Sequence, residues 1–142
     1  MAGAMQARRS PVVLIVDDDH AYRDAVAEIL MFEGYETLKA WSVEGALAIL
    51  DTQSPDIILS DTLTSKFNGA SVLRAVRSDQ RWAQIPVITA SANAMVSDKV
   101  AAFAAGADGF LAKPFSTVEL LAEVGRQLMR SGALVEAAEF TK

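Results

Sequence analysis

The sequence predicts an α/β domain with a doubly wound, five-stranded parallel sheet. Five short apolar runs rich in β-branched residues alternate with segments whose apolar residues recur at helical spacing. Runs that are apolar throughout, such as residues 12–16, suit strands covered on both faces, and helical crossovers of this length suit parallel pairing. The expected strands are VVLIV (12–16), YETLKA (35–40), DIILS (56–60), PVITA (86–90) and GFLA (109–112).

Capping residues indicate where the helices between these strands begin and end. The first helix carries an apolar stripe from Tyr22 onward and ends at Gly34, a natural C-terminal stop. Ser42 can cap a second helix, and Ser116 with Glu119 reads as a capping box for the last one. The third, fourth and fifth helices are marked by Val72, Leu73 and Val76; by Val96, Val100 and Phe103, ahead of a stop at Gly106; and by Leu120, Leu121, Val124 and Leu128.

Size and composition restrict the class of protein. The 142 residues, of which 51% are hydrophobic, suit one folded domain with a real core. A formal net charge of -5 argues against direct nucleic-acid binding by this domain, and the absence of cysteine excludes disulfides and thiolate chemistry. No apolar stretch long enough for a membrane span or a signal peptide is apparent. We therefore expect a cytoplasmic protein with a leader over residues 1–10, a domain over 11–130, and a helical extension or start of a linker over 131–142.

Charged and hydroxyl side chains follow the predicted strands. Asp17 and Asp18 follow the first strand, Asp61 the third, Ser91 the fourth and Lys113 the fifth. In a doubly wound sheet, ligands bind outside the carboxyl ends of the strands, so these side chains should converge on one cleft. Crowded carboxylates repel one another, and a bound Mg²⁺ with oxygen ligands would offset that repulsion. A lysine and a serine opposite them would suit the oxygens of a phosphoryl group, which indicates phosphoryl transfer to a carboxylate.

Four motifs then carry a resemblance to a known family. The segments LIVDDD, PDIILSD, PVITASA and GADGFLAKPF occur in this order and at consistent separations. Together they resemble the receiver domain of response regulators in two-component signalling, over roughly residues 11–130. The resemblance implies a flavodoxin-like sheet of order 2-1-3-4-5.

The same resemblance implies roles for individual residues. Asp61 would be the phosphoacceptor, Asp18 a direct Mg²⁺ ligand and Asp17 a ligand through water. The backbone carbonyl of Leu63 would complete the protein's share of the metal shell. Lys113 would pair with the phosphoryl oxygens.

A second group of implied roles concerns switching and signal lifetime. Ser91 would hydrogen-bond the phosphoryl group, and Phe110 would hold the aromatic switch position. Leu63 and Asn93 occupy the positions that tune hydrolysis of the acyl phosphate. The peptide bond between Lys113 and Pro114 is expected to be cis, as in the family.

One loop departs from the family pattern. After Asp61 the family usually has apolar residues, a proline and a glycine, whereas this chain has TLTSKFNG, with Ser65 and Lys66 at the proline and glycine positions. We expect the metal site to persist through the Leu63 carbonyl, with altered loop mobility and partner contacts.

Neighbouring residues have simpler interpretations. Asp19 suits a helix N-cap better than a metal ligand. His20, the only histidine, suits the surface at the start of a helix.

The resemblance implies a phosphoacceptor signalling module and not an enzyme with an external substrate. Its partners would be a sensor histidine kinase or phosphotransfer protein, and an output domain or target that binds the surface of the fourth helix, fifth strand and fifth helix. A homodimer is another expected assembly.

Two alternatives remain open. One is a Mg²⁺-dependent phosphohydrolase of the haloacid-dehalogenase type that uses Asp17 and Asp19, although Asp61 would then have no role. The other is a degenerate receiver that binds partners without phosphorylation, which only the Ser65-Lys66 loop supports.

Overall fold

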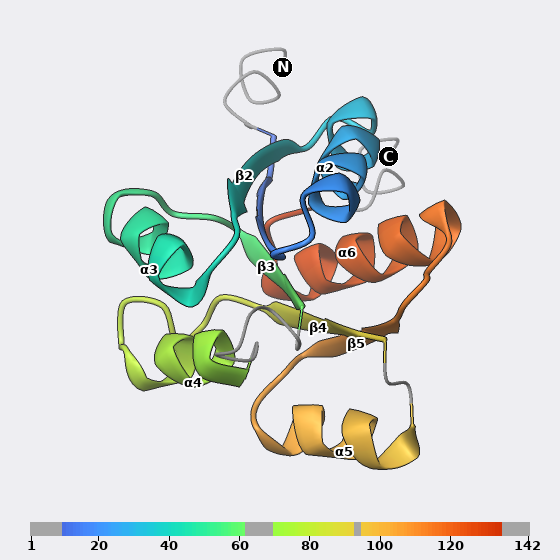
Figure 1. Cartoon of the computed structure of the whole chain (residues 1–142). Helices are drawn as coiled ribbons and strands as arrows, with labels where there is room; N and C mark the ends of the chain where they lie inside the picture. The colour runs from blue at the N-terminus through green and yellow to red at the C-terminus, as the bar shows by residue number, and fades with distance from the viewer. Residues whose placement is uncertain (1–9, 62–69, 93–94, 135–142) are drawn as a thin grey trace, which may run out of the picture.

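The computed structural model describes residues 10–61, 70–92 and 95–134, and over these ranges five strands alternate with five helices (Figure 1). Three predicted strands start one residue later than expected, and Asp61 and Ser91 are the last residues of their strands. The predicted alternation is confirmed. The elements are β1 (Val12–Val16), α2 (His20–Phe32), β2 (Glu36–Ala40), α3 (Val43–Thr52), β3 (Ile57–Asp61), α4 (Ala70–Ser78), β4 (Val87–Ser91), α5 (Val96–Ala104), β5 (Gly109–Ala112) and α6 (Thr117–Ser131).

The sheet has the strand order β2-β1-β3-β4-β5, and every neighbouring pair is parallel. This confirms the predicted flavodoxin-like order. From β1 the chain first adds β2 on one side and then β3 on the other, so the order reverses between β1 and β3. Their carboxyl ends therefore flank the crevice in which such sheets bind ligands.

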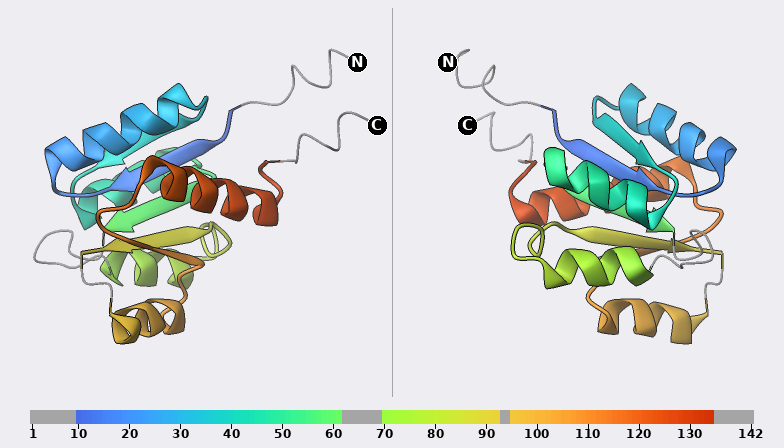
Figure 2. Two further views of the ribbon diagram at one scale, coloured as in Figure 1. Left: turned by 90° about the vertical axis from the view of Figure 1, so that its right-hand side faces the viewer. Right: turned by 60° about the vertical axis from the view of Figure 1, so that its left-hand side comes forward.

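The sheet is covered by helices on both faces, because alternate strand residues point to opposite sides. In β1, Val13 and Ile15 pack in one core cluster with α2 and α6, whereas Leu14 and Val16 pack in a second cluster with α3, α4 and α5. All four are nearly inaccessible to solvent. Figure 2 shows α2 and α6 together on one side of the sheet and the other helices on the opposite side.

The expected helix caps are present. The side chains of Asp19 and Ser42 each accept a backbone N–H bond in the first turn of the following helix. Ser116 and Glu119 form the predicted capping box of α6, with N···O distances of 3.0 and 2.8 Å. Gly34 has φ 104°, a conformation that other residues adopt only with strain. Local hydrogen bonding thus fixes where α2, α3 and α6 begin.

Helix α5 differs from an ordinary core helix, because the apolar residues that predicted it face solvent. Val96, Val100 and Phe103 are 78%, 60% and 44% exposed, and Ala102 is the buried residue of the helix. The small side chain of Ala102 packs against the core while the larger apolar side chains of the helix remain outside.

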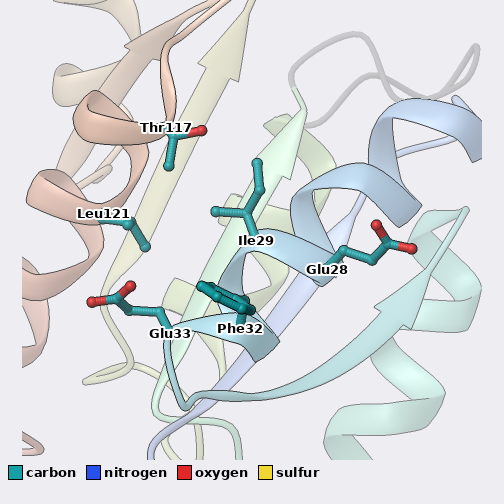
Figure 3. Close-up of a pocket in the computed structure, with 6 residues that line it drawn as sticks. All are labelled: Glu28, Ile29, Phe32, Glu33, Thr117 and Leu121. Carbon is teal, nitrogen blue, oxygen red and sulfur yellow. The ribbon is translucent and has the colours of Figure 1, made fainter.

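A shallow groove runs between α2 and α6 (Figure 3). Its apolar part includes Ile29, Leu121 and Phe32, whose side chain is 93% exposed, and Glu28 and Glu33 lie beside them. The groove contains none of the residues predicted to carry phosphoryl chemistry. No helix in the described part of the chain is long and apolar enough to cross a membrane.

Candidate functional site

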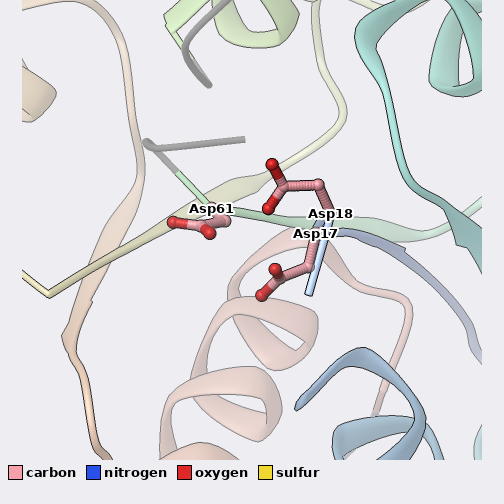
Figure 4. A group of neighbouring side chains, drawn as sticks. All are labelled: Asp17, Asp18 and Asp61. Carbon is pink, nitrogen blue, oxygen red and sulfur yellow. The ribbon is translucent and has the colours of Figure 1, made fainter. Parts of the chain in front are cut away.

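Three carboxylates meet at the carboxyl edge of the sheet. Asp17 and Asp18 follow β1, and Asp61 ends the neighbouring strand β3. One oxygen from each carboxylate lies within 4.8 Å of the other two (Figure 4). Asp17 and Asp61 are 4% and 6% exposed, whereas Asp18 is exposed to solvent. Hard oxygen donors grouped in this way, with one side open to water, fit a cation such as Mg²⁺.

Lys113, which directly follows the edge strand β5, binds two of these carboxylates. Its Nζ lies 2.9 Å from Oδ2 of Asp17 and 3.1 Å from Oδ2 of Asp61, and its side chain is 15% exposed. Burial alone would lower the pKa of Lys113, but the hydrogen bonds and negative charges of the two aspartates outweigh it and raise that pKa. Burial raises the pKa of Asp17 in spite of the opposing effect of Lys113. Ionised Asp17 is therefore held at an energetic cost that a bound cation would reduce.

Backbone hydrogen bonds hold the strand ends that carry these groups. The Asp17 N–H donates to the carbonyl of Ala40 at 3.0 Å, and the Lys113 N–H donates to the carbonyl of Ser91 at 2.8 Å. The peptide bond between Lys113 and Pro114 is cis, as predicted.

Asp19 is not one of the three clustered carboxylates, which are those of Asp17, Asp18 and Asp61. Its Oδ1 accepts the backbone N–H of Tyr22 at 3.1 Å, which makes it the N-cap of α2. Its own N–H donates to Oδ1 of Asp17 at 2.9 Å and so orients that carboxylate. The prediction that Asp19 is a cap is confirmed.

Ser91 and Phe110 lie on adjacent strands. Ser91 is 4% exposed at the carboxyl end of β4, on the same edge as the carboxylates. Phe110 is half-buried in β5, packs against the core cluster beneath α3, α4 and α5, and has the Nζ of Lys99 6.0 Å from its ring centroid. Leu63 and Asn93, predicted to tune hydrolysis, lie outside the described residues, as do Ser65 and Lys66.

Two residues in the first turn of α2 contact the site although their sequence pattern did not predict it. Tyr22 places its ring 4.3 Å, measured to the centroid, from the Nζ of Lys113. Arg23 is 6% exposed and donates from Nη1 to the carbonyl of Asp17 at 3.1 Å. Side chains in a first helical turn point back toward the preceding loop, so the helix start at Asp19 was a signal that both residues lie near the site, although it does not specify their contacts.

Arg23 connects the segment after β1, which carries Asp17 and Asp18, to the neighbouring loop after β2. Its Nη2 donates to Nδ1 of His20 at 2.9 Å, and its guanidinium carbon lies 5.6 Å from the ring centroid of Trp41. Trp41 itself is 60% exposed. A buried arginine that bonds the Asp17 carbonyl restrains the backbone from which two of the carboxylates project.

The sequence matches a known domain family over most of its length. The family model for the response regulator receiver domain matches residues 13–125. The chain belongs to this family. It is a receiver domain of two-component signalling, and its acidic strand ends lie at the carboxyl edge of the sheet.

Curated response regulators are similar to this receiver domain over part of their length. The DNA-binding dual master transcriptional regulator RpaA of Synechocystis sp. is 36% identical over 132 residues, which are 93% of this chain and 55% of RpaA. The phosphate regulon transcriptional regulatory protein PhoB of Pseudomonas aeruginosa is 34% identical over 120 residues, covering 84% of this chain and 52% of PhoB. The chain thus spans about half the length of these relatives.

Solved receiver domains share the fold over nearly their whole length. A CheY-like receiver domain protein from Methanospirillum hungatei superposes with a TM-score of 0.79 at 28% identity, covering 87% of this chain and 97% of the other. The chemotaxis response regulator CheY4 of Vibrio cholerae gives a TM-score of 0.79 at 31% identity, with coverage of 84% and 99%.

Proposed function

We propose that this receiver domain accepts a phosphoryl group on Asp61 from the phosphohistidine of a sensor histidine kinase or a phosphotransfer protein. The observation that carries the proposal is the ammonium of Lys113, which bonds both Asp17 and Asp61 within the group of three carboxylates. Phosphoryl transfer depends mainly on positioning and charge neutralisation, and this arrangement supplies both beside a carboxylate nucleophile.

In the proposed step, an Asp61 carboxylate oxygen attacks the phosphorus of the donor. A P–O bond forms, the P–N bond to the donor imidazole breaks, and the imidazole nitrogen takes the leaving electron pair. Lys113 would turn its ammonium from the carboxylates toward the equatorial oxygens of the phosphoryl group. Because the ammonium already lies 3.1 Å from Oδ2 of Asp61, rotation of the lysine side chain would be enough for this contact.

The three carboxylates fit Mg²⁺, which prefers oxygen ligands and retains several waters. Bound there, Mg²⁺ would supply positive charge next to the transferred group. Asp18, the exposed member, would be a direct ligand, Asp17 would bind through water, and the Leu63 carbonyl would complete the protein's share.

The hydrolase alternative is not supported by the position of Asp19. That hypothesis pairs Asp17 with Asp19, but the Asp19 carboxylate is engaged in capping α2, and Asp61 occupies the place beside Asp17. The match to the receiver family over residues 13–125 points the same way.

The output of phosphorylation would be a change of the surface formed by α5, β5 and α6. Ser91 would hydrogen-bond the phosphoryl group, and Phe110 would change rotamer in response, which is a population shift between two states. The exposed apolar residues Val96, Val100 and Phe103 on α5 support a role for this surface in contacting a target, an output domain or a second copy of the chain.

Output by DNA binding would need a separate domain. RpaA is described as DNA-binding, and this chain covers 55% of it. The net charge of -5 does not favour direct contact with DNA by the receiver itself. We therefore place any nucleic-acid contact in another domain or partner. We also propose that the receiver domain spans residues 11–130, between a leader over 1–10 and an extension over 131–142, and that it acts in the cytoplasm.

The test is to incubate the chain with acetyl phosphate and Mg²⁺ and to map the modified residue by mass spectrometry. The proposal predicts a single added phosphoryl group on Asp61, and none in Asp61→Asn. A label on Asp17 or Asp19 would favour the hydrolase, and a chain that takes no label would favour a degenerate receiver.

A further inference from the structure

The ammonium of Lys113 contacts an aromatic ring in addition to its two carboxylates. Its Nζ lies over the face of Tyr22, 4.3 Å from the ring centroid. The face of an aromatic ring attracts a cation, and the attraction is stronger where the cation is partly removed from water, as it is here with a side chain 15% exposed. The aromatic ring and the two aspartates therefore hold the ammonium from different sides.

The Tyr22 ring is itself fixed in place. Its backbone N–H is bonded to the N-cap Asp19, and its ring meets that of Phe115 edge-on, with centroids 5.5 Å apart and planes inclined at 72°. The side chain also packs against the core cluster beneath α2 and α6. A ring held by a cap, by a neighbouring aromatic side chain and by the core is a fixed surface for the lysine ammonium.

The ring differs from the carboxylates in what else it can bind. Asp17 and Asp61 are the groups that a metal and a phosphoryl group would engage, so their oxygens would be shared between these and Lys113. The ring face takes part in neither contact. It would attract the ammonium equally well before and after the carboxylates are engaged.

We infer that Tyr22 is a positioning residue for Lys113, which keeps the ammonium beside Asp61 while the carboxylates engage metal and phosphoryl group. The inference rests on the proposed function for its consequence, although the contact itself does not. Because the contact is made by the ring face, the phenol hydroxyl is not required.

The experiment compares Tyr22→Phe, which keeps the ring, with Tyr22→Leu. Leucine removes the ring but is apolar and compatible with a helix. In NMR spectra of the full chain without metal, the ε-methylene protons of Lys113 should be shifted upfield by the ring in wild type and Tyr22→Phe. They should return to their ordinary position in Tyr22→Leu. Far-UV circular dichroism checks that each variant is folded, and Tyr22→Met replaces Tyr22→Leu if the latter is not.

The functional measurement is the rate of phosphorylation by acetyl phosphate at saturating Mg²⁺. Tyr22→Phe should label within about twofold of wild type, and Tyr22→Leu about tenfold more slowly, the size expected for a partly desolvated cation that loses its ring. Equal loss in both variants would overturn the inference, because the hydroxyl and not the ring would then matter. A normal rate in Tyr22→Leu with the upfield shift gone would overturn it too.

The two measurements separate this inference from the proposed function. If wild type takes no label on Asp61, the proposed function fails and the positioning role fails with it. If wild type is labelled but its Lys113 protons show no upfield shift, the role of Tyr22 fails while the proposed function stands.

Discussion

Lys113 donates a hydrogen bond across the sheet to Asp17, 96 positions earlier in the chain, with Nζ 2.9 Å from Oδ2. The strands that carry them, β5 and β1, are separated in the sheet by β4 and β3. The contact is possible because all parallel strands end at one edge and the lysine side chain reaches over Asp61. Three ionised carboxylates and one ammonium leave a formal charge of two negative units, which matches a divalent cation.

Mg²⁺ affinity should depend on Asp18 far more than on Asp19. Asp18→Ala removes an exposed carboxylate from the group of three, whereas Asp19→Ala removes a helix cap outside it. We expect Asp18→Ala to weaken Mg²⁺ binding at least tenfold, which corresponds to about 1.4 kcal/mol. Asp19→Ala should instead lower the free energy of unfolding by about 1 kcal/mol. A fluorescence or NMR titration measures the affinity, and equal losses in the two variants would refute this assignment.

Arg23 should contribute to stability through the Asp17 carbonyl. Arg23→Ala removes a charge-assisted bond of 3.1 Å and leaves a buried carbonyl without that donor, which should cost about 1.5–3 kcal/mol of unfolding free energy. Arg23→Lys, which keeps the charge but not the planar guanidinium, is the matched control. Its free energy of unfolding should lie between those of wild type and Arg23→Ala. Urea unfolding measures both. A loss below about 0.5 kcal/mol in Arg23→Ala would place it among ordinary surface substitutions.

Metal-free protein should show a pH dependence from Asp17. Burial raises the pKa of Asp17 above its ordinary value of 3.8, so the folded state binds this proton more tightly than the unfolded state does. The resulting stability is fully present below pH 3.8 and is lost as the pH rises through the folded-state pKa.

Asp17→Asn isolates this contribution, because asparagine does not ionise. In chelator, wild type should lose unfolding free energy relative to Asp17→Asn as the pH is raised from 3.8 toward neutrality. Added Mg²⁺ at neutral pH should raise the free energy of unfolding of wild type more than that of Asp17→Asn. A wild type that gains stability relative to Asp17→Asn over that pH range would show that Lys113, and not burial, dominates.

The residue pattern was sufficient to predict the parallel sheet and the meeting of Asp17, Asp18, Asp61 and Lys113, and the resemblance to receiver domains supplied the strand order. Apolar strands and the parallel topology bring all residues at strand ends to one edge, whatever the details of packing. The contacts of Tyr22 and Arg23 depend on side-chain rotamers in one helical turn, which strand and helix periodicity does not specify. The exposure of Val96 and Phe103 also escaped prediction, because spacing reveals a stripe but not which way the helix faces.

The lifetime of the phosphorylated state should depend on position 63, a prediction made from the sequence because this residue lies outside the described ranges. Leu63 has no polar group to orient an attacking water, and Asn93 offers an amide but no base. Leu63→Asn should shorten the lifetime of phospho-Asp61 several-fold, and a tenfold change would need only about 1.4 kcal/mol of barrier. Loss of label after removal of the donor, in excess Mg²⁺, measures it. An unchanged or longer lifetime would point instead to the Ser65-Lys66 loop.

The most direct measurement of the central claim is the site of phosphorylation in wild type and Asp61→Asn, mapped by mass spectrometry after incubation with acetyl phosphate and Mg²⁺. Asp61 lies 3.1 Å from the Lys113 ammonium and within 4.8 Å of Asp17 and Asp18, so we expect one phosphoryl group on Asp61 of wild type. Asp61→Asn, which removes the nucleophilic carboxylate, should take no label while keeping its fold. A label that persists on Asp17 or Asp19 in Asp61→Asn, or a wild type that is never labelled, would contradict the claim.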